Sequence, residues 1–199
     1  MINLLLLALA WEAGAARVSV APEKLPVIVN CFFNERKVDK LTSPLEAKAL
    51  VVKSGSERVA LVLVDSCMMP REVIDRGKAE AAKRTGIAAE RMLVAATHTH
   101  FAPAAMGCLG SDEEPGYGDF LAGRIARAII EANARLEPVE LGAAAVEDRE
   151  HTFNRRWLYR ANAPLKDPFG ESTVWANMHP WYENPAAVTP SGPVDAGLT

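Results

Sequence analysis

A hairpin followed by a helix and a further strand is the pattern that most constrains the fold of this chain. Two apolar runs, Leu45–Lys53 and Arg58–Asp65, are separated by a short polar turn with a glycine, a spacing that predicts a β-hairpin. A helical pattern then opens at Pro70 and ends at Gly86, and Leu93–Ala96 follows as a buried strand. Strand, helix and strand in this order predict a βαβ unit whose right-handed crossover makes the two strands parallel.

Further elements are predicted around this unit. Arg17–Val20 and Val27–Phe33 have the β-branched and aromatic content of strands. Phe120–Leu136 has the apolar stripe of an amphipathic helix, and Val139–Val146 is the predicted strand after it. From His151 onward, frequent Pro and Gly leave little room for regular elements. The predicted fold class is α/β, a mixed sheet with a βαβ unit, helices packed on it, and a long irregular C-terminal segment.

Length, composition and charge limit the class of protein. The chain has 199 residues, of which 49% are hydrophobic and 24% charged, values ordinary for one substantial globular domain. The formal net charge is -3, and acidic and basic residues are interspersed. Because no one-sided basic surface is indicated, we expect no nucleic-acid partner.

The N-terminus resembles a secretory signal peptide. Leu4–Trp11 is an unbroken apolar run, and Ala13, Gly14 and Ala15 follow as small residues that suit signal peptidase. We therefore expect a signal peptide over residues 1–16 and an extracytoplasmic protein, periplasmic or secreted. No Lys or Arg precedes the run, so a buried N-terminal strand and a mis-set start codon stay open as alternatives.

Three cysteines, Cys31, Cys67 and Cys108, show no metal-type spacing. Their odd number allows at most one internal disulfide, with one thiol left over. We expect them to be packing residues.

Two histidines at the end of a predicted strand are the main candidates for chemistry. Met92–His100 reads as a short apolar run that ends in His98 and His100. Alternate side chains of a strand point to one face, so the two imidazoles are expected side by side. Imidazole is a common metal ligand and a general acid or base near neutral pH, and strand ends are where open α/β sheets place their sites. The alternative is a chance His-X-His triplet.

Two further residues are weaker candidates. Asp65 ends a predicted strand, where it can hold a metal, orient a histidine or cap the next helix; we favour the orientation of a ligating histidine. Arg155 follows a later strand and can offer two hydrogen bonds to a carboxylate or an amide oxygen, although loop arginines are more often solvated. His151 and His179 lie in the irregular C-terminal segment, where a structural or solvent-facing role is the default.

The order of these motifs resembles one enzyme family. Ala95–Pro103, with the sequence AATHTHFAP, resembles the T-H-T-H-S-G-P segment of neutral/alkaline non-lysosomal ceramidases. The resemblance extends over residues 45 to 199 through the strand that ends in Asp65, the Thr85-Gly86-Ile87 turn, Asn154-Arg155, and the late residues Asn184, Pro185, Pro190, Gly192, Pro193 and Asp195.

The resemblance implies a zinc-dependent hydrolase that cleaves the amide bond of N-acylsphingosine-like lipids. It implies that His98 binds one Zn²⁺ ion, and that His100 and Arg155 act near the substrate. It also implies a small-molecule or lipid amide substrate and is compatible with peripheral membrane contact. Phe101 and Ala102 depart from the family's Ser-Gly, and Arg156 stands where a serine is usual, which puts the lipid specificity in doubt.

The family's remaining zinc ligands, a second His, a Glu and a Tyr, are expected beyond residue 199. Residues 17–199 are therefore expected to be the N-terminal part of a ceramidase-like catalytic domain, incomplete at the C-terminus and inactive alone, because a catalytic zinc typically has three protein ligands. Two alternatives stay open: a metal-dependent hydrolase of a sugar, phosphate or peptide substrate, and a non-catalytic exported module.

Overall fold

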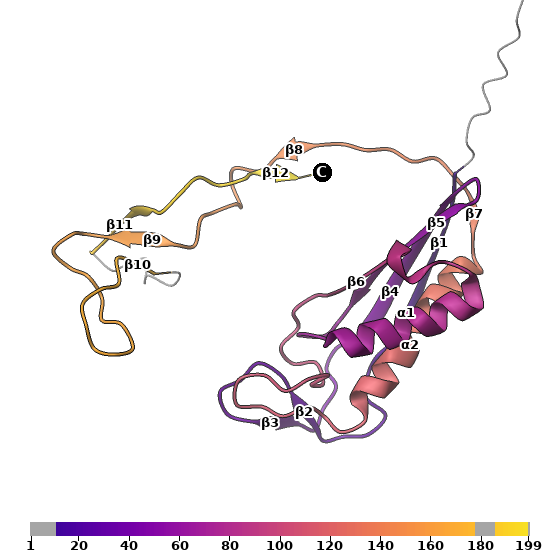
Figure 1. Ribbon diagram of the computed structural model, residues 1–199, viewed down its shortest axis with the longest axis horizontal. Helices are drawn as coiled ribbons and strands as arrows, with labels where there is room; N and C mark the ends of the chain where they lie inside the picture. The colour runs from indigo at the N-terminus through magenta and orange to yellow at the C-terminus, as the bar shows by residue number, and fades with distance from the viewer. Residues whose placement is uncertain (1–10, 178–185, 199) are drawn as a thin grey trace, which may run out of the picture. The chain divides into compact units, whose positions relative to one another are not determined.

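The chain forms two compact units, Met1–Leu141 and Gly142–Thr199, each described here by itself. A computed structural model describes residues 11–177 and 186–198. The first unit contains a five-stranded sheet with two helices on it (Figure 1). The second contains only short strands joined by irregular segments.

The sheet of the first unit has the strand order β6-β5-β4-β1-β7. Its strands are β1 (Trp11–Ser19), β4 (Glu46–Ser54), β5 (Glu57–Val64), β6 (Met92–Ala96) and β7 (Glu137–Val139). The helices are α1 (Arg71–Thr85) and α2 (Tyr117–Asn133), with a short 3-10 helix at Ala89–Arg91, and β2 (Val27–Val29) pairs with β3 (Arg36–Val38) in a separate ribbon. β5 and β6 are parallel, and the other neighbours in the sheet are antiparallel.

The predicted hairpin and βαβ unit are both confirmed. β4 and β5 pair from Ala47 opposite Val64 to Ser54 opposite Glu57, so the polar turn joins them directly. α1 begins just after Pro70 and ends at Gly86, whose φ of 71° is the left-handed conformation that glycine adopts without a steric penalty. The α/β fold class with a mixed sheet is therefore as predicted.

Three predicted boundaries are wrong. β1 begins at Trp11 instead of Arg17, and α2 begins three residues before Phe120, after Gly116 in a left-handed conformation. The strand predicted over residues 139–146 ends at Val139, because the last pair that β1 offers to β7 is Trp11 with Val139. Among the residues that the structure describes, those from 140 to 145 pair with no strand of this sheet.

β1 bears on the predicted signal peptide. Residues 1–10 lie outside the described part of the chain, but residues 11–16 are the first two thirds of β1. They pair with β4 along their whole length and with β7 at Trp11–Ala13, and Ala16 is buried. Removal of residues 1–16 would take most of a strand out of the sheet, so a boundary at residue 16 stays a prediction that this pairing disfavours.

The core lies between the sheet and the helices. α2 lies against β1 and β4, and α1 packs on α2. Glycine permits both close approaches: an added Cβ at Gly77 of α1 would lie 3.1 Å from the Ala122 carbonyl oxygen, and one at Gly14 of β1 would collide with the Ala132 carbonyl oxygen of α2. Among the large apolar side chains of this core, the fully buried ones include Val20, Val51, Val62, Val64, Leu121, Ile125 and Ile129.

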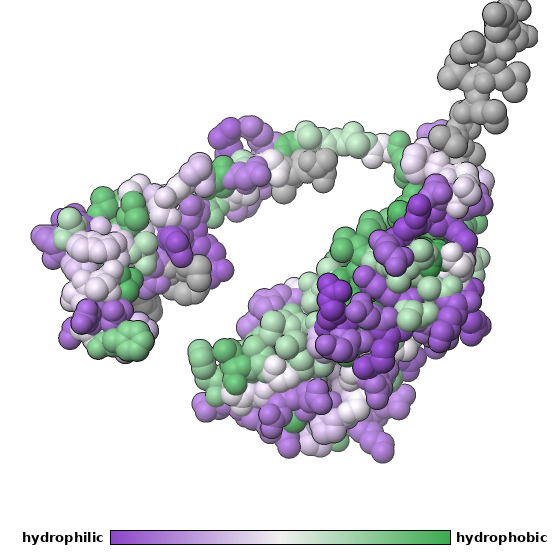
Figure 2. All heavy atoms as spheres, viewed as in Figure 1, coloured by the Kyte–Doolittle hydropathy of each residue, from purple (hydrophilic) through white to green (hydrophobic). Residues whose placement is uncertain are grey.

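The other face of the sheet is apolar and exposed within this unit. Strand alternation sends Val62 and Val64 of β5 into the core and Leu61 and Leu63 outward, with exposed fractions of 44% and 54%. Leu93 of β6 is 63% exposed. Figure 2 shows apolar side chains gathered over β5 and β6. Contiguous apolar patches of this kind mark contact surfaces.

The exposed apolar side chains of this face lead to a prediction about self-association. Exchanging Leu61 and Leu63 together for lysine is expected to lower self-association of the chain, measured by light scattering, because charge replaces exposed apolar surface. The free energy of unfolding should change by only about 0.5 kcal/mol per site, since neither side chain is buried. Val62→Lys is the matched control: Val62 is 2% exposed, so burying its charge should unfold the unit. If Leu61→Lys and Leu63→Lys destabilised the unit as much as Val62→Lys, Leu61 and Leu63 would not lie on the exposed face of the sheet.

The second unit confirms the irregular C-terminal segment. Its strands are β8 (Val146–Glu147), β9 (Trp157–Tyr159), β10 (Ala176–Asn177), β11 (Ala187–Pro190) and β12 (Gly197–Leu198). They form a three-stranded sheet of order β10-β9-β11 and a pair of β12 with β8.

Across the part of the chain that the structure describes, no helix has the length and apolarity needed to cross a membrane.

Candidate metal site

The carboxyl ends of β5 and β6 place two loops side by side. Because these strands are parallel, both chains leave the sheet at the same edge. The backbone N–H of Thr97 donates to the Val64 carbonyl at 3.0 Å, and that of Thr99 donates to the Ser66 carbonyl at 3.1 Å. The pairing therefore continues past the strands and carries His98 to the side of Cys67.

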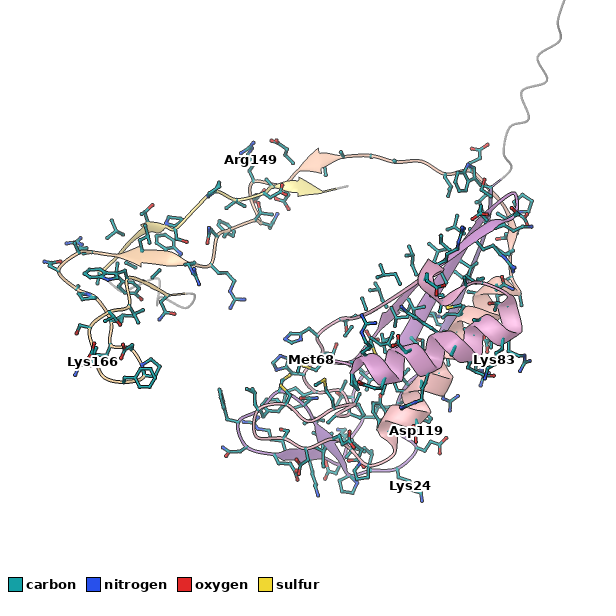
Figure 3. All side chains as sticks on the ribbon, in the orientation of Figure 1. Lys24, Met68, Lys83, Asp119, Arg149 and Lys166 are labelled. Atoms are coloured by element: carbon teal, nitrogen blue, oxygen red, sulfur yellow. The ribbon has the colours of Figure 1, made fainter. Side chains whose placement is uncertain are left out.

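A third segment reaches the same edge from β2. Ala104 N–H donates to the Ile28 carbonyl at 2.9 Å, and the buried Asn30 amide donates to the Met106 carbonyl at 2.6 Å. Cys31 follows with a φ of 66°, an uncommon conformation for a residue with a side chain. These contacts fix the chain after β2 against residues 103–111 and direct Cys31 toward the end of β5. Figure 3 labels Met68, the residue after Cys67, at this end of the sheet.

His98 and His100 lie together, as the sequence predicted. Their Nε2 atoms are 3.2 Å apart, and their rings meet edge to face with centroids 4.8 Å apart. His98 has a φ of 63°, so the chain turns sharply there instead of continuing β6. Both side chains are exposed at the edge of the sheet. The two imidazoles therefore lie together because the chain turns after β6. The strand alternation that was expected to place them on one face is not the cause.

The other nitrogen of His98 is held by backbone. Nδ1 lies 3.0 Å from the Cys67 carbonyl oxygen and donates its proton there. This hydrogen bond selects the tautomer whose Nε2 carries a lone pair, which is the form that binds a metal. The Cys67 carbonyl therefore orients the His98 ring, and the lone pair of its Nε2 faces His100 Nε2 at 3.2 Å.

Asp65 does not provide that orientation. Its Oδ2 accepts from the Glu46 backbone N–H at 3.0 Å and from Lys48 Nζ at 3.2 Å, and its Oδ1 accepts from the Thr97 hydroxyl at 3.4 Å. The prediction that Asp65 orients a ligating histidine is corrected. The carboxylate faces β4 because β5 has β4 as its other neighbour in the sheet.

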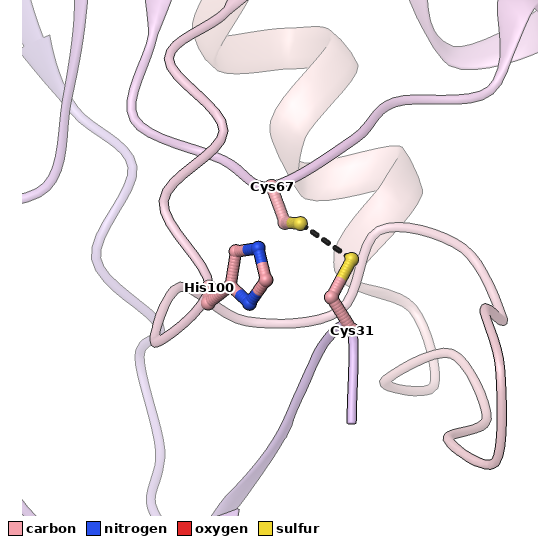
Figure 4. A group of neighbouring side chains, drawn as sticks. All are labelled: Cys31, Cys67 and His100. Atoms are coloured by element: carbon pink, nitrogen blue, oxygen red, sulfur yellow. Dashed lines mark hydrogen bonds between the residues drawn. The ribbon is translucent and has the colours of Figure 1, made fainter. Parts of the chain in front are cut away.

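The three cysteines cluster, and two of them lie beside the histidines. Cys31 Sγ lies 2.6 Å from Cys67 Sγ and 3.9 Å from Cys108 Sγ, and Cys67 Sγ lies 3.6 Å from His98 Nδ1. Ligand atoms of Cys31, Cys67 and His100 all lie within 4.8 Å of one another, a group compact enough to hold a metal ion (Figure 4). We call these three residues the Cys2His group.

The expectation that the cysteines only fill packing space missed the Cys2His group. Each member follows a different strand, β2, β5 or β6, so no short motif in the sequence connects them. The sequence did indicate that Cys67 and the histidine pair both follow predicted parallel strands, and it could therefore have suggested that they lie close together.

The pKa values of two of the thiols, Cys31 and Cys108, are raised. Burial, and then the hydrogen bond with Cys67, raises the pKa of the Cys31 thiol above its ordinary value. Desolvation also raises the pKa of the Cys108 thiol. Both groups are therefore neutral near pH 7, whereas catalytic cysteines have depressed pKa values. The raised pKa values therefore disfavour Cys31 and Cys108 as catalytic nucleophiles.

The remaining candidates lie elsewhere. Arg155 belongs to the second unit, beside Asn154, whose side chain donates to the Gly192 carbonyl at 3.1 Å. Its place near the histidines stays a prediction. His151 contacts Asp148 at 3.1 Å in the same unit, where backbone and side-chain hydrogen bonds from His151 lower the pKa of that carboxyl. His179, Asn184 and Pro185 lie outside the described residues.

Comparison with known proteins supports the fold. No family model and no curated protein matches the chain. Among solved structures, neutral ceramidase from Pseudomonas aeruginosa matches with a TM-score of 0.63 and 24% identity, over 74% of this chain and 25% of its own length. A ceramidase solved in complex with C2 gives the same values.

The chain thus spans about a quarter of the length of the ceramidase structures it matches. The resemblance to ceramidases is confirmed at the level of the fold: most of this chain has the fold of one part of neutral ceramidase.

Proposed function

We propose that this chain is part of a zinc-dependent hydrolase of the neutral ceramidase type, which cleaves the amide bond of N-acylsphingosine-like lipids. The observation that carries the proposal is the pair of His98 and His100 at the carboxyl ends of parallel strands, in a fold shared with part of neutral ceramidase. The substrate class comes from the family resemblance.

In this proposal His98 is a zinc ligand through Nε2. Its Nδ1 proton is already engaged by the Cys67 carbonyl, so Nε2 carries the lone pair that a metal needs without a change of tautomer; His100 Nε2, 3.2 Å away, would have to move aside for the ion. A bound zinc ion supplies a water of lowered pKa and polarises the scissile carbonyl.

His100 and Arg155 are assigned to the substrate. Near His98, an imidazole N–H of His100 can donate to the amide oxygen as negative charge develops on it. Arg155 can offer its guanidinium to the same region.

The rest of the proposed site is expected outside this chain. A second His, a Glu and a Tyr complete the zinc ligands in the family, and their expected place is beyond residue 199. Export to an extracytoplasmic compartment and a peripheral contact with membranes are further parts of the proposal. The exposed apolar face of β5 and β6 is consistent with a chain that packs against additional protein.

A substrate panel tests the proposal. The longer protein that contains this sequence is assayed with a short-chain N-acylsphingosine, a glycoside and a phosphodiester, before and after chelation of zinc. We expect hydrolysis of the N-acylsphingosine alone, loss after chelation and recovery with added Zn²⁺. Cleavage of the glycoside or phosphodiester instead would assign a metal-dependent hydrolase of another class. If a folded, zinc-loaded protein hydrolysed none of the three substrates, the non-catalytic exported module would be the remaining assignment.

A further inference from the structure

The Cys2His group is a set of metal ligands that the proposed zinc site does not use. It combines two sulfurs and an imidazole from the segments after β2, β5 and β6. We propose that Cys31, Cys67 and His100 bind one soft or borderline cation, Zn²⁺ or Cu⁺, independently of any residue beyond this chain.

The separations suit one ion after a small adjustment. Zinc binds sulfur at about 2.3 Å and imidazole nitrogen at about 2.0–2.1 Å, so two ligand atoms on one tetrahedral ion lie roughly 3.5–3.8 Å apart. The three ligand atoms are all within 4.8 Å of one another, and the two sulfurs are 2.6 Å apart. The sulfurs must separate by roughly 1 Å, which rotation about χ1 provides. Figure 4 shows both sulfurs pointing toward each other with the His100 ring beside them.

The ligand types select the class of cation. Thiolates favour Zn²⁺ and Cu⁺ over Mg²⁺ and Ca²⁺, which take oxygen ligands. Cys67 is buried, Cys31 is partly buried and His100 is exposed, so the group is anchored in protein on its sulfur side and open on its imidazole side. Two cysteines and one histidine with an open fourth position form a known arrangement for zinc.

This site is distinct from the zinc on His98. The cation is held from the two sulfurs and His100, whereas the proposed catalytic zinc takes Nε2 of His98 and ligands expected beyond residue 199. Because His100 belongs to both assignments, a cation on the Cys2His group withdraws His100 from the substrate. Its binding would therefore inhibit amide hydrolysis if the proposed function holds.

Metal titration of this chain tests the proposal without an activity assay. The reduced, metal-free chain is titrated with Co²⁺, followed for thiolate-to-cobalt absorption, and then with Zn²⁺ against a chromogenic chelator. We expect one ion per chain with thiolate absorption. Cys31→Ser and Cys67→Ser should each weaken zinc binding by more than about 100-fold, the upper end of what loss of an outer-shell partner costs.

Two matched variants isolate the site. Cys108→Ser removes the third thiol, and His151→Asn removes a histidine of the second unit; both should leave zinc affinity within about 3-fold, since neither residue belongs to the Cys2His group. Zinc should also protect two of the three wild-type thiols from alkylation, a measurement that needs no variant. The proposal is overturned by binding without thiolate absorption, by equal loss in Cys108→Ser, or by a Cys31–Cys67 disulfide that persists under reducing conditions.

Discussion

Gly14→Ala is expected to lower the free energy of unfolding by about 3 kcal/mol, the upper range for overpacking a filled core. An alanine Cβ at this position in β1 would collide with the Ala132 carbonyl oxygen and lie 2.8 Å from the Arg135 carbonyl carbon. These are backbone atoms at the end of α2, so no side-chain rotation relieves the clash. β1 and α2 would have to separate, which opens the core between them. Urea denaturation followed by circular dichroism measures the loss.

Gly123→Ala is the matched control for Gly14→Ala. Gly123 lies in α2, and no atom lies within 4 Å of the place where its Cβ would be. Alanine is favoured over glycine in a helix by about 1 kcal/mol, so this variant should be slightly more stable than the original chain. If Gly14→Ala were equally neutral, β1 would not lie against α2 as described, and removal of residues 1–16 would become compatible with the fold.

His98→Asn in the longer protein is expected to remove the catalytic zinc and to lower kcat/KM for the amide substrate by about 1,000-fold or more. Zinc contributes several kcal/mol to such reactions, and each 1.36 kcal/mol is tenfold in rate. Asparagine is the suitable replacement because His98 has a φ of 63°, a conformation that asparagine tolerates better than alanine. The substitution therefore removes the ligand with little added backbone strain. Zinc content and kinetics are measured on the same preparation.

His151→Asn provides the control for that experiment. His151 is an exposed histidine that contacts Asp148 in the second unit and has no assigned metal role. Zinc content and kcat/KM should stay near those of the original protein. If His98→Asn kept both its zinc and its activity, the assignment of His98 would be wrong, although the Cys2His group could still bind its cation.

The local sequence was sufficient for the hairpin, for α1 and for the parallel pair of β5 and β6. Each depends on short-range physics: a glycine-containing turn between apolar runs, Pro70 before a helix, and Gly86 in the left-handed conformation after it. The pairing of His98 with His100 was also predictable, because a single residue separates them and both follow a strand end.

Pairing with distant strands decided what the local pattern could not. The signal peptide over residues 1–16 stays a prediction, but residues 11–16 pair with β4, and residues 11–13 also with β7, strands that lie far along the chain. In the same way, the short strand β7 pairs with β1, from Ala13 opposite Glu137 to Trp11 opposite Val139. Signal peptides and buried strands share an apolar composition, so composition alone does not separate them.

By itself the sequence determined the βαβ unit and the histidine pair, since both follow from residues close together in the chain. Only the tertiary structure brought Cys31, Cys67 and His100 together, and only it replaced Asp65 by the Cys67 carbonyl as the partner of His98. The physical reason is that three separate strands end at one edge of the first unit, where contacts across 31 to 77 positions of the chain join residues that no sequence motif connects.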